Sequence, residues 1–420
     1  MIRWPNCFWL PVVSVALLSC GTPRVAEDSA TTHEGPTWRG EVQPIVVAKC
    51  QGCHDNNTVG GFPLTNFEEV TAIATTVRDA VAQRRMPPWS ANNDCIEYEG
   101  DISLSDEERQ TILDWVDNGA PEGQGPLMEV QSLTSVDDLA RVDLVIQPEE
   151  PFLPQQSPDD YRCFAVDWPE TEETFVTGYQ VVPDAESIVH HVIAYILPGE
   201  YREDLEALEA EDGRPGYTCY GGPGPINLED AAWLGGWAPG GIDRQLPAGT
   251  GIRVAPDSII VLQMHYNIPS DNTLADQTRI DVMVSQDEQT EAWIQPFANP
   301  FWLYGDRMEI PANSTNHKET FSFTFQGGGT IYSANLHMHT LGKSGRFTLQ
   351  RADGSEQCLL HVPAYDFDWQ RSYRFKEPVV IGPGDRLKLE CVFDNPTDED
   401  VHWGDGTEDE MCLTTMYMID

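Results

Sequence analysis

Two cysteines and a histidine in the stretch Cys50-Gln51-Gly52-Cys53-His54 constrain the fold of the N-terminal region more than any other feature. Two thiols separated by two residues, with an imidazole directly after them, form the signature by which a haem c is attached. The thiols bond the porphyrin and the imidazole ligates the iron. A redox-active Cys-x-x-Cys pair is the alternative, so the surrounding sequence has to discriminate between the two.

The sequence around this motif predicts three helices. One helical pattern covers residues 37–49 and ends at the motif, and a second covers residues 67–84. Ser105, with a glutamate three residues later, is a capping box that begins a third helix, and Gly119 is a typical glycine at its end. Three helices around one haem make a small cytochrome c, so we expect residues 36–125 to be an all-α haem module.

The sixth iron ligand of this haem is expected to be a methionine, because a neutral thioether raises the potential of a c-type haem. Met86 is the candidate, since two prolines directly after it would rigidify the loop. A packing role for Met86 is the alternative. Met128 is the nearest rival, but it falls in residues 126–160, which are rich in Pro, Gly and acids and read as a linker.

The N-terminus predicts export. Arg3 is followed by an apolar run that ends in Leu17-Leu18-Ser19-Cys20-Gly21. This run is too short to span a bilayer, so residues 1–19 read as a secretory signal peptide. Its end resembles a bacterial lipobox, in which Cys20 becomes the lipidated first residue; an ordinary signal peptide is the alternative. We therefore expect a periplasmic or cell-surface lipoprotein of a bacterial envelope, anchored to the membrane only by its lipid, with disulfides among its remaining cysteines.

The charge of the chain excludes one class of partner. Lys and Arg number 25 against 68 Asp and Glu, which gives a formal net charge of −43. Long-range electrostatics of this sign repel nucleic acid and anionic membrane surfaces. We expect no nucleic-acid partner.

The remainder of the chain reads as β-structure. Short β-branched and aromatic runs alternate with Gly, Pro, Asn and Asp turns, and one acidic helix is expected near residues 203–211. This spacing predicts antiparallel sandwiches or jelly rolls. The length is large for one sandwich, so we expect two jelly-roll domains, residues 161–288 and 289–420, divided near Ser285–Glu291.

Five of the ten histidines fall in three strand-like clusters: His190-His191, Gln263-Met264-His265-Tyr266-Asn267 and His337-Met338-His339. Alternation along a strand places His337 and His339 on one face, where two imidazoles can bind one metal. His190 and His191 are adjacent, so binding one ion requires a bulge or a strand end, and one of them can ligate through Nδ1. Each cluster alone is weak; together they predict metal sites. His317, His361 and His402 are expected to be surface or structural residues.

These clusters, with Asp409-Glu410-Met411-Cys412 and Tyr417 after them, stand in the order found in a known family. Residues 160–420 resemble the copper type II, ascorbate-dependent monooxygenases, such as peptidylglycine α-hydroxylating monooxygenase and dopamine β-hydroxylase. The arrangement with an N-terminal haem module resembles uncharacterised bacterial members, and Asp366-Phe367-Asp368-Trp369-Gln370 fits that comparison.

The resemblance implies two copper ions on two jelly rolls that face a solvent-filled cleft. It assigns His190, His191 and His265 to an electron-transfer copper, and His337, His339 and Met411 to an oxygen-binding catalytic copper. A packing role is the alternative for Met411. The resemblance also implies a Cys391–Cys412 disulfide. Gln263 and Tyr266 are expected either to shape the cleft or to serve strand packing.

The expected function is hydroxylation of an activated C–H bond with dioxygen, with electrons passing from ascorbate or a redox protein through the haem to the His190/His191/His265 copper. Two alternatives stay open: a non-enzymatic copper and haem electron-transfer or copper-binding lipoprotein, and a haem lipoprotein with a β-sandwich adhesion module. The substrate, a small molecule or a peptide, is not identified, and no arginine motif of the family transfers to this chain. The pairing of Cys95, Cys163, Cys219 and Cys358 also stays open.

Overall fold

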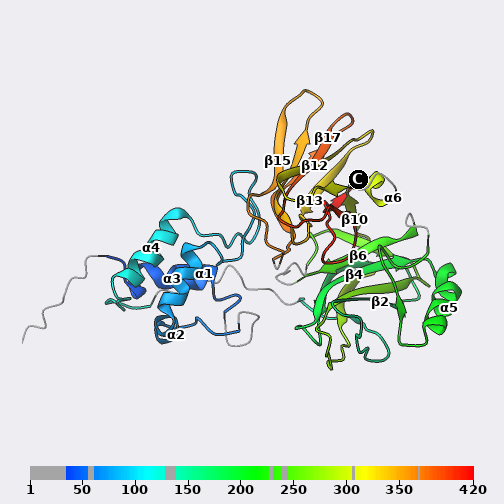
Figure 1. Cartoon of the computed structure of the whole chain (residues 1–420), viewed down its shortest axis with the longest axis horizontal. Helices are drawn as coiled ribbons and strands as arrows, with labels where there is room; N and C mark the ends of the chain where they lie inside the picture. The colour runs from blue at the N-terminus through cyan, green and yellow to red at the C-terminus, as the bar shows by residue number, and fades with distance from the viewer. Residues whose placement is uncertain are drawn as a thin grey trace, which may run out of the picture.

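The computed structural model describes residues 35–54, 61–127, 139–226, 230–238, 245–304, 308–367 and 369–420. The predicted signal peptide, Cys20 and Met128 lie outside these ranges. Most of the described chain is β-sheet, as expected, with a small helical part set apart from it (Figure 1). None of the helices in the described ranges has the length and apolar content needed to cross a membrane.

The helical module packs around two tryptophans. Trp38 and Trp115 are fully buried, with ring centroids 5.9 Å apart. The predicted capping box is present, because Ser105 and Glu108 bond each other's backbone at the start of the last helix. The helix expected over residues 67–84 is interrupted at Ile73, where the backbone leaves the helical region. The elements of the module are η1 (Trp38–Val42, a π-helical turn), α1 (Gln43–Lys49), α2 (Phe67–Ala72), α3 (Ala74–Ala82) and α4 (Asp106–Asp117).

Two β-sandwiches follow the module. The first places a five-stranded sheet against one half of a long eight-stranded sheet, and the second places a four-stranded sheet against the other half. The five-stranded sheet has the order β5 (Tyr217–Thr218), β2 (Asp159–Asp167), β8 (Ile259–Asn267), β4 (Val189–Leu197), β6 (Ala232–Trp237). The four-stranded sheet has the order β12 (Ser314–Thr324), β17 (Arg386–Asn395), β14 (Gly342–Gln350), β15 (Glu356–Val362).

The eight-stranded sheet runs through both sandwiches. Residues 285–291, where we expected the two domains to divide, contain the connection between β9 and β10. Strand β10 pairs in parallel with β7 of the first half of the sheet and antiparallel with β19 of the second half. The order is β1 (Leu144–Ile146), β9 (Arg279–Ser285), β3 (Thr174–Val182), β7 (Thr250–Val254), β10 (Thr290–Phe297), β19 (Thr414–Ile419), β13 (Gly329–Ala334), β16 (Tyr373–Ile381). Short elements complete the fold: η2 (Gly199–Tyr201), α5 (Arg202–Asp212), α6 (Pro300–Tyr304), β11 (Glu309–Ile310) and β18 (Val401–His402).

Three disulfides join the described cysteines: Cys95–Cys358, Cys163–Cys219 and Cys391–Cys412. The last is the pair that the family resemblance implies. The first bonds the loop between α3 and α4 to β15 of the second sandwich, across 263 residues of sequence. We call residues 86–99 of this loop the strap.

One buried ion pair gives a stability prediction. Arg162 on β2 is fully buried, and its guanidinium donates to both carboxylate oxygens of Asp212 at the end of α5, at 2.7 and 2.9 Å. These hydrogen bonds hold the pKa of Asp212 below its ordinary value of 3.8. Asp212→Asn leaves a buried, uncompensated cation and should cost about 3 kcal/mol of unfolding free energy.

Denaturant titration checks this cost, with Asp204→Asn on the exposed face of α5 as the matched control. Because the pKa of Asp212 is lowered on folding, its contribution is complete at neutral pH and declines only as the pH falls below 3.8. The difference between the wild-type protein and Asp212→Asn should therefore shrink in strong acid. A difference that is equally large in strong acid would contradict the assignment.

Candidate metal centre

Three of the predicted histidines converge at adjacent strands of the first sandwich. His191 on β4 lies opposite His265 on β8, and the register shifts between Val189 and His191, which turns His190 toward the same side. The Nδ1 atom of His191 lies 3.3 Å from that of His190 and 3.2 Å from that of His265. One ring nitrogen from each residue lies within 4.8 Å of the others. The sequence predicted that His190 and His191 need a strand irregularity to face one ion, and that one of them can ligate through Nδ1. The register shift and the Nδ1 distances agree with this expectation.

Two residues of β2, Asp159 and Tyr161, fix the position of His265. Its Nε2 donates to Asp159 at 2.8 Å, which leaves Nδ1 free to face the other two imidazoles. Tyr161 stacks on the His265 ring, with centroids 4.2 Å apart and planes 7° apart. Asp159 also accepts from the Thr407 hydroxyl at 2.7 Å, and the Tyr161 hydroxyl donates to the Asp405 carbonyl. This part of the first sandwich therefore touches the loop of the second sandwich that leads to Met411.

Burial favours the neutral form of three of the clustered histidines, His190, His191 and His339. Burial lowers the pKa of His190 to about 4 and the pKa of His191 well below its usual range. Burial likewise lowers the pKa of His339 to about 3, with a further contribution from His337. A neutral imidazole is the form that binds metal. Three ring nitrogens that converge, in a described group with no acidic member, fit a copper ion.

The remaining predicted ligands lie together in the second sandwich. His337 and His339 follow β13, with ring centroids 5.1 Å apart. The Nδ1 of His339 donates to the Asp409 carbonyl at 2.9 Å, and the Nδ1 of His337 bonds the Gln370 side chain. Both Nε2 atoms are thus left to face a metal. This is the arrangement expected of metal-binding histidines, whose second nitrogen is usually occupied by a hydrogen bond.

Met411 follows the loop that supplies Asp409. Its neighbour Cys412 is buried and bonded to Cys391 of β17, so the chain is fixed directly beside the thioether. Glu410 accepts from the backbone N–H groups of His339 and Leu341, and burial raises the pKa of this carboxyl to about 7. The loop of Met411 is therefore tied to the histidine pair. We refer to His337, His339 and Met411 as the His-His-Met set.

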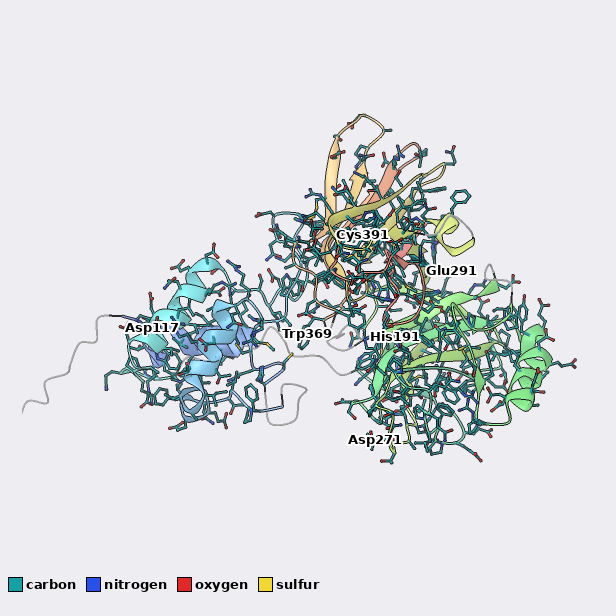
Figure 2. All side chains as sticks on the ribbon, in the orientation of Figure 1. Asp117, His191, Asp271, Glu291, Trp369 and Cys391 are labelled. Carbon is teal, nitrogen blue, oxygen red and sulfur yellow. A yellow bond between two sulfur atoms is a disulfide. The ribbon has the colours of Figure 1, made fainter. Side chains whose placement is uncertain are left out.

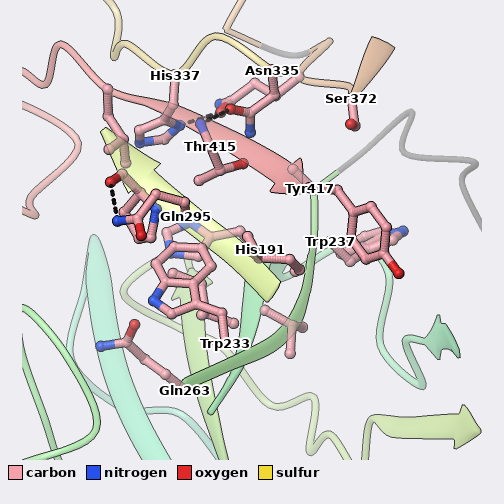
Figure 3. Close-up of a pocket in the computed structure, with 18 of the residues that line it drawn as sticks. His191, Trp233, Trp237, Gln263, Gln295, Asn335, His337, Ser372, Thr415 and Tyr417 are labelled. Carbon is pink, nitrogen blue, oxygen red and sulfur yellow. Dashed lines mark hydrogen bonds between the residues drawn. The ribbon is translucent and has the colours of Figure 1, made fainter. Parts of the chain in front are cut away.

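A cavity of about 940 Å³ lies between the sandwiches and touches both groups. His191 reaches it from the first sandwich, and His337, His339 and Met411 from the second (Figure 3). The rings of His191 and His337 have centroids only 6.5 Å apart. The other lining is largely aromatic and polar, and includes Trp233, Trp237, Trp293, Gln295, Asn335, Tyr417 and Gln263. The two groups thus share one cavity.

Some of the other residues that the sequence singled out in the two sandwiches line the cavity, and others lie elsewhere. Gln263 lines the cavity, whereas Tyr266 is buried in the first sandwich and donates to Asp276, so its role is packing. His317 bonds Glu319 on β12, and His361 and His402 lie on β15 and β18. Sequence reasoning missed Asp159, because its partners His265 and Thr407 lie far away in the sequence.

The haem signature lies after α1. Cys50 and Cys53 are half-buried and lie outside the described disulfides, and burial raises the pKa of Cys50 to about 12, so the Cys50 thiol is neutral. His54 is buried, and its Nδ1 donates to the Phe62 carbonyl at 3.1 Å, which leaves Nε2 for an iron. Met86 is half-buried at the start of the strap. Two thiols outside the described disulfides and the tautomer of His54 fit a covalent haem.

Residues 302–419 match the family described as "Copper type II ascorbate-dependent monooxygenase, C-terminal domain". DBH-like monooxygenase protein 1 of Homo sapiens is 24% identical over 248 residues, which cover 54% of this chain and 39% of that protein. DBH-like monooxygenase protein 2 of Mus musculus is 28% identical over 253 residues, 55% of this chain and 38% of that protein. Tyramine beta-hydroxylase of Caenorhabditis briggsae is 23% identical over 251 residues, which cover 56% of this chain and 40% of that protein. The chain thus spans about two fifths of the length of these relatives.

Proposed function

We propose that the chain is an exported dicopper monooxygenase that hydroxylates an activated C–H bond with dioxygen and draws electrons through a haem c on its helical module. One observation carries the proposal: three imidazoles converge on one point, and one of them, His191, lines the same cavity as the His-His-Met set. Imidazoles suit both oxidation states of copper, whereas a thioether favours Cu(I), the state that reacts with dioxygen. The matching relatives support the copper chemistry.

The protein's own residues set the conditions for this chemistry. His190, His191 and His265 would hold the electron-transfer copper, and the His-His-Met set would hold the oxygen-binding copper. When bound, the two ions supply one electron each to dioxygen. Asp159, Gln370 and the Asp409 carbonyl fix the tautomers, so that the free nitrogens face the ions. The aromatic lining binds the apolar body of a substrate, and the cavity has room for a small molecule or the end of a peptide.

A haem c would be held by Cys50, Cys53 and His54, with Met86 as its sixth ligand. When bound, the haem would accept one electron at its iron from an external reductant and pass it to the coppers. Three disulfides fit an exported protein, and we propose lipidation at Cys20 as the membrane anchor.

Metal analysis and oxygen uptake test the function together. Purified protein should contain about two coppers and one haem per chain, and its oxygen uptake should match the hydroxylated product formed from a cell extract. Copper and haem without product would favour an electron-transfer or copper-binding protein instead. Haem without copper would favour the adhesion module.

Asp159 gives a prediction for His190, His191 and His265, which we call the three-histidine cluster. Asp159→Asn keeps the shape of the side chain but removes the charge that orients His265. Loss of such an outer partner should weaken Cu(II) binding at this cluster by about 10–100-fold, as measured by competition with a chromophoric chelator. Asp271→Asn, at an exposed position of the same sandwich (Figure 2), is the control. Equal copper affinity in the two variants would show that Asp159 does not orient the ligand.

A further inference from the structure

We propose that the strap fixes the helical module against the second sandwich. Electrons from the haem then pass through Trp89, Arg371 and Gln370 to His337 of the His-His-Met set. They would not enter at the three-histidine cluster, where the family resemblance alone places electron acceptance. This inference rests on the proposed haem and copper content of the chain.

The strap is built into the second sandwich by covalent, polar and aromatic contacts. Cys95 is bonded to Cys358, and Tyr98 is buried in the core of this sandwich, with its hydroxyl donating to the Leu359 carbonyl at 3.1 Å. Tyr98 also forms a β-bridge with Phe375 of β16. Backbone bonds from Asn92 to the His361 carbonyl and from Lys376 to the Glu97 carbonyl add to these. The helical module is therefore docked by its own loop and does not depend on a flexible linker.

A continuous series of contacts leads from the strap to the cavity. Met86 is separated from Trp89 only by two prolines. The Arg371 guanidinium lies over the Trp89 ring, 4.7 Å from its centroid, and Arg371 lines the cavity. Its Nε is buried and has no hydrogen-bond partner among the described residues, so the aromatic face of Trp89 is its main contact there. The preceding residue, Gln370, bonds the Nδ1 of His337.

A longer branch leads from the same segment to the three-histidine cluster. The Gln370 amide donates to the Phe367 carbonyl at 3.0 Å, and the Phe367 ring stacks on His190 with centroids 4.7 Å apart. This branch requires two further contacts, whereas His337 is bonded to Gln370 directly. Trp369, in the same segment, lies between the helical module and the sandwiches (Figure 2). The shorter route therefore ends at the His-His-Met set.

The transfer balances as a single-electron step. Ferrous haem is oxidised to ferric haem, and one Cu(II) at the His-His-Met set is reduced to Cu(I). No covalent bond forms or breaks. A second electron, by the same route or through the 6.5 Å contact between the His191 and His337 rings, then fills the other copper.

The test is anaerobic flash reduction of the haem, by a flavin semiquinone, in the full-length protein loaded with Cu(II). Haem reoxidation is followed at its absorption band, and the copper that is reduced is identified by freeze-quench electron paramagnetic resonance. His265→Ala, which weakens the three-histidine cluster, should slow the reoxidation far less than His337→Ala does. His337→Ala should slow it by about tenfold or more. The opposite result, with His265→Ala slow and His337→Ala unchanged, would overturn the proposal.

A strap variant tests the route itself. Trp89→Leu should slow haem reoxidation by about tenfold with both coppers bound, whereas Trp302→Leu, which removes a buried indole elsewhere in the same sandwich, should not. If Trp89→Leu fails to fold, Arg371→Leu removes the next contact and should show the same slowing. An unchanged rate in the folded variant would reject the route. Because neither substrate nor dioxygen is present, a protein that transfers electrons but forms no product would reject the proposed hydroxylation alone.

Discussion

Replacing Met411 by alanine is expected to abolish hydroxylation while one copper stays bound to His190, His191 and His265. Cys412 remains bonded to Cys391, so the substitution removes the thioether without releasing its loop. The remaining histidine pair then lacks the ligand that favours Cu(I). Since even an outer partner of a metal ligand accounts for 10–100-fold in activity, loss of the ligand itself should reduce product formation by about 100-fold or more.

Product is measured by mass spectrometry, and copper is counted in the same samples. Met283→Ala is the matched control, because Met283 is half-buried on β9, outside the residues that line the cavity. Retention of hydroxylation would assign Met411 to packing. Loss of both coppers together would indicate one shared site in place of two.

Replacing Cys50 and Cys53 together by serine is expected to remove the covalent haem and to abolish hydroxylation driven by a donor protein. Neither thiol belongs to a described disulfide, so the substitution breaks none of these bonds. Hydroxylation supported by ascorbate should persist, because the ligands of both proposed copper sites lie in the sandwiches, away from the helical module. Pyridine haemochrome spectra and product formation with each reductant check the two halves of this prediction.

The contrast between the two reductants gives this experiment its force. Equal loss of activity with ascorbate would mean that the haem serves the fold of the chain, and circular dichroism of the variant would then show unfolding. Equal retention with the donor protein would mean that electrons reach the coppers without the haem.

Local sequence rules predicted the local structure well. The capping box at Ser105, the glycine at Gly119 and the acidic helix near residues 203–211 are all present, because short-range hydrogen bonds and periodicity determine them. The three histidine clusters were found because each carries its signal within a few residues. Their distances to one another had to come from the fold.

The features that escaped prediction depend on contacts between distant segments. Asp159 reaches His265 and Thr407, more than 100 and more than 200 residues away, and nothing near Asp159 in the sequence marks it. The strap was read only as a loop that would hold Met86, since its pairing with β16 and its disulfide to Cys358 join opposite ends of the chain. Cysteine pairing has no local signature, so four cysteines stayed unassigned until the fold was known.

The continuous eight-stranded sheet limits how far the two sandwiches can move apart around the cavity. A hinge between the sandwiches would have to break the parallel ladder of Thr290–Ala292 with Thr250–Ile252, or the antiparallel ladder that joins β10 to β19. Backbone hydrogen bonds of this kind resist rigid-body opening, so the distance between the three-histidine cluster and the His-His-Met set is determined by strand register. Admission of substrate then falls to loops at the rim. The two sandwiches should also melt as one cooperative unit in calorimetry, while the helical module, outside this sheet, is free to unfold separately.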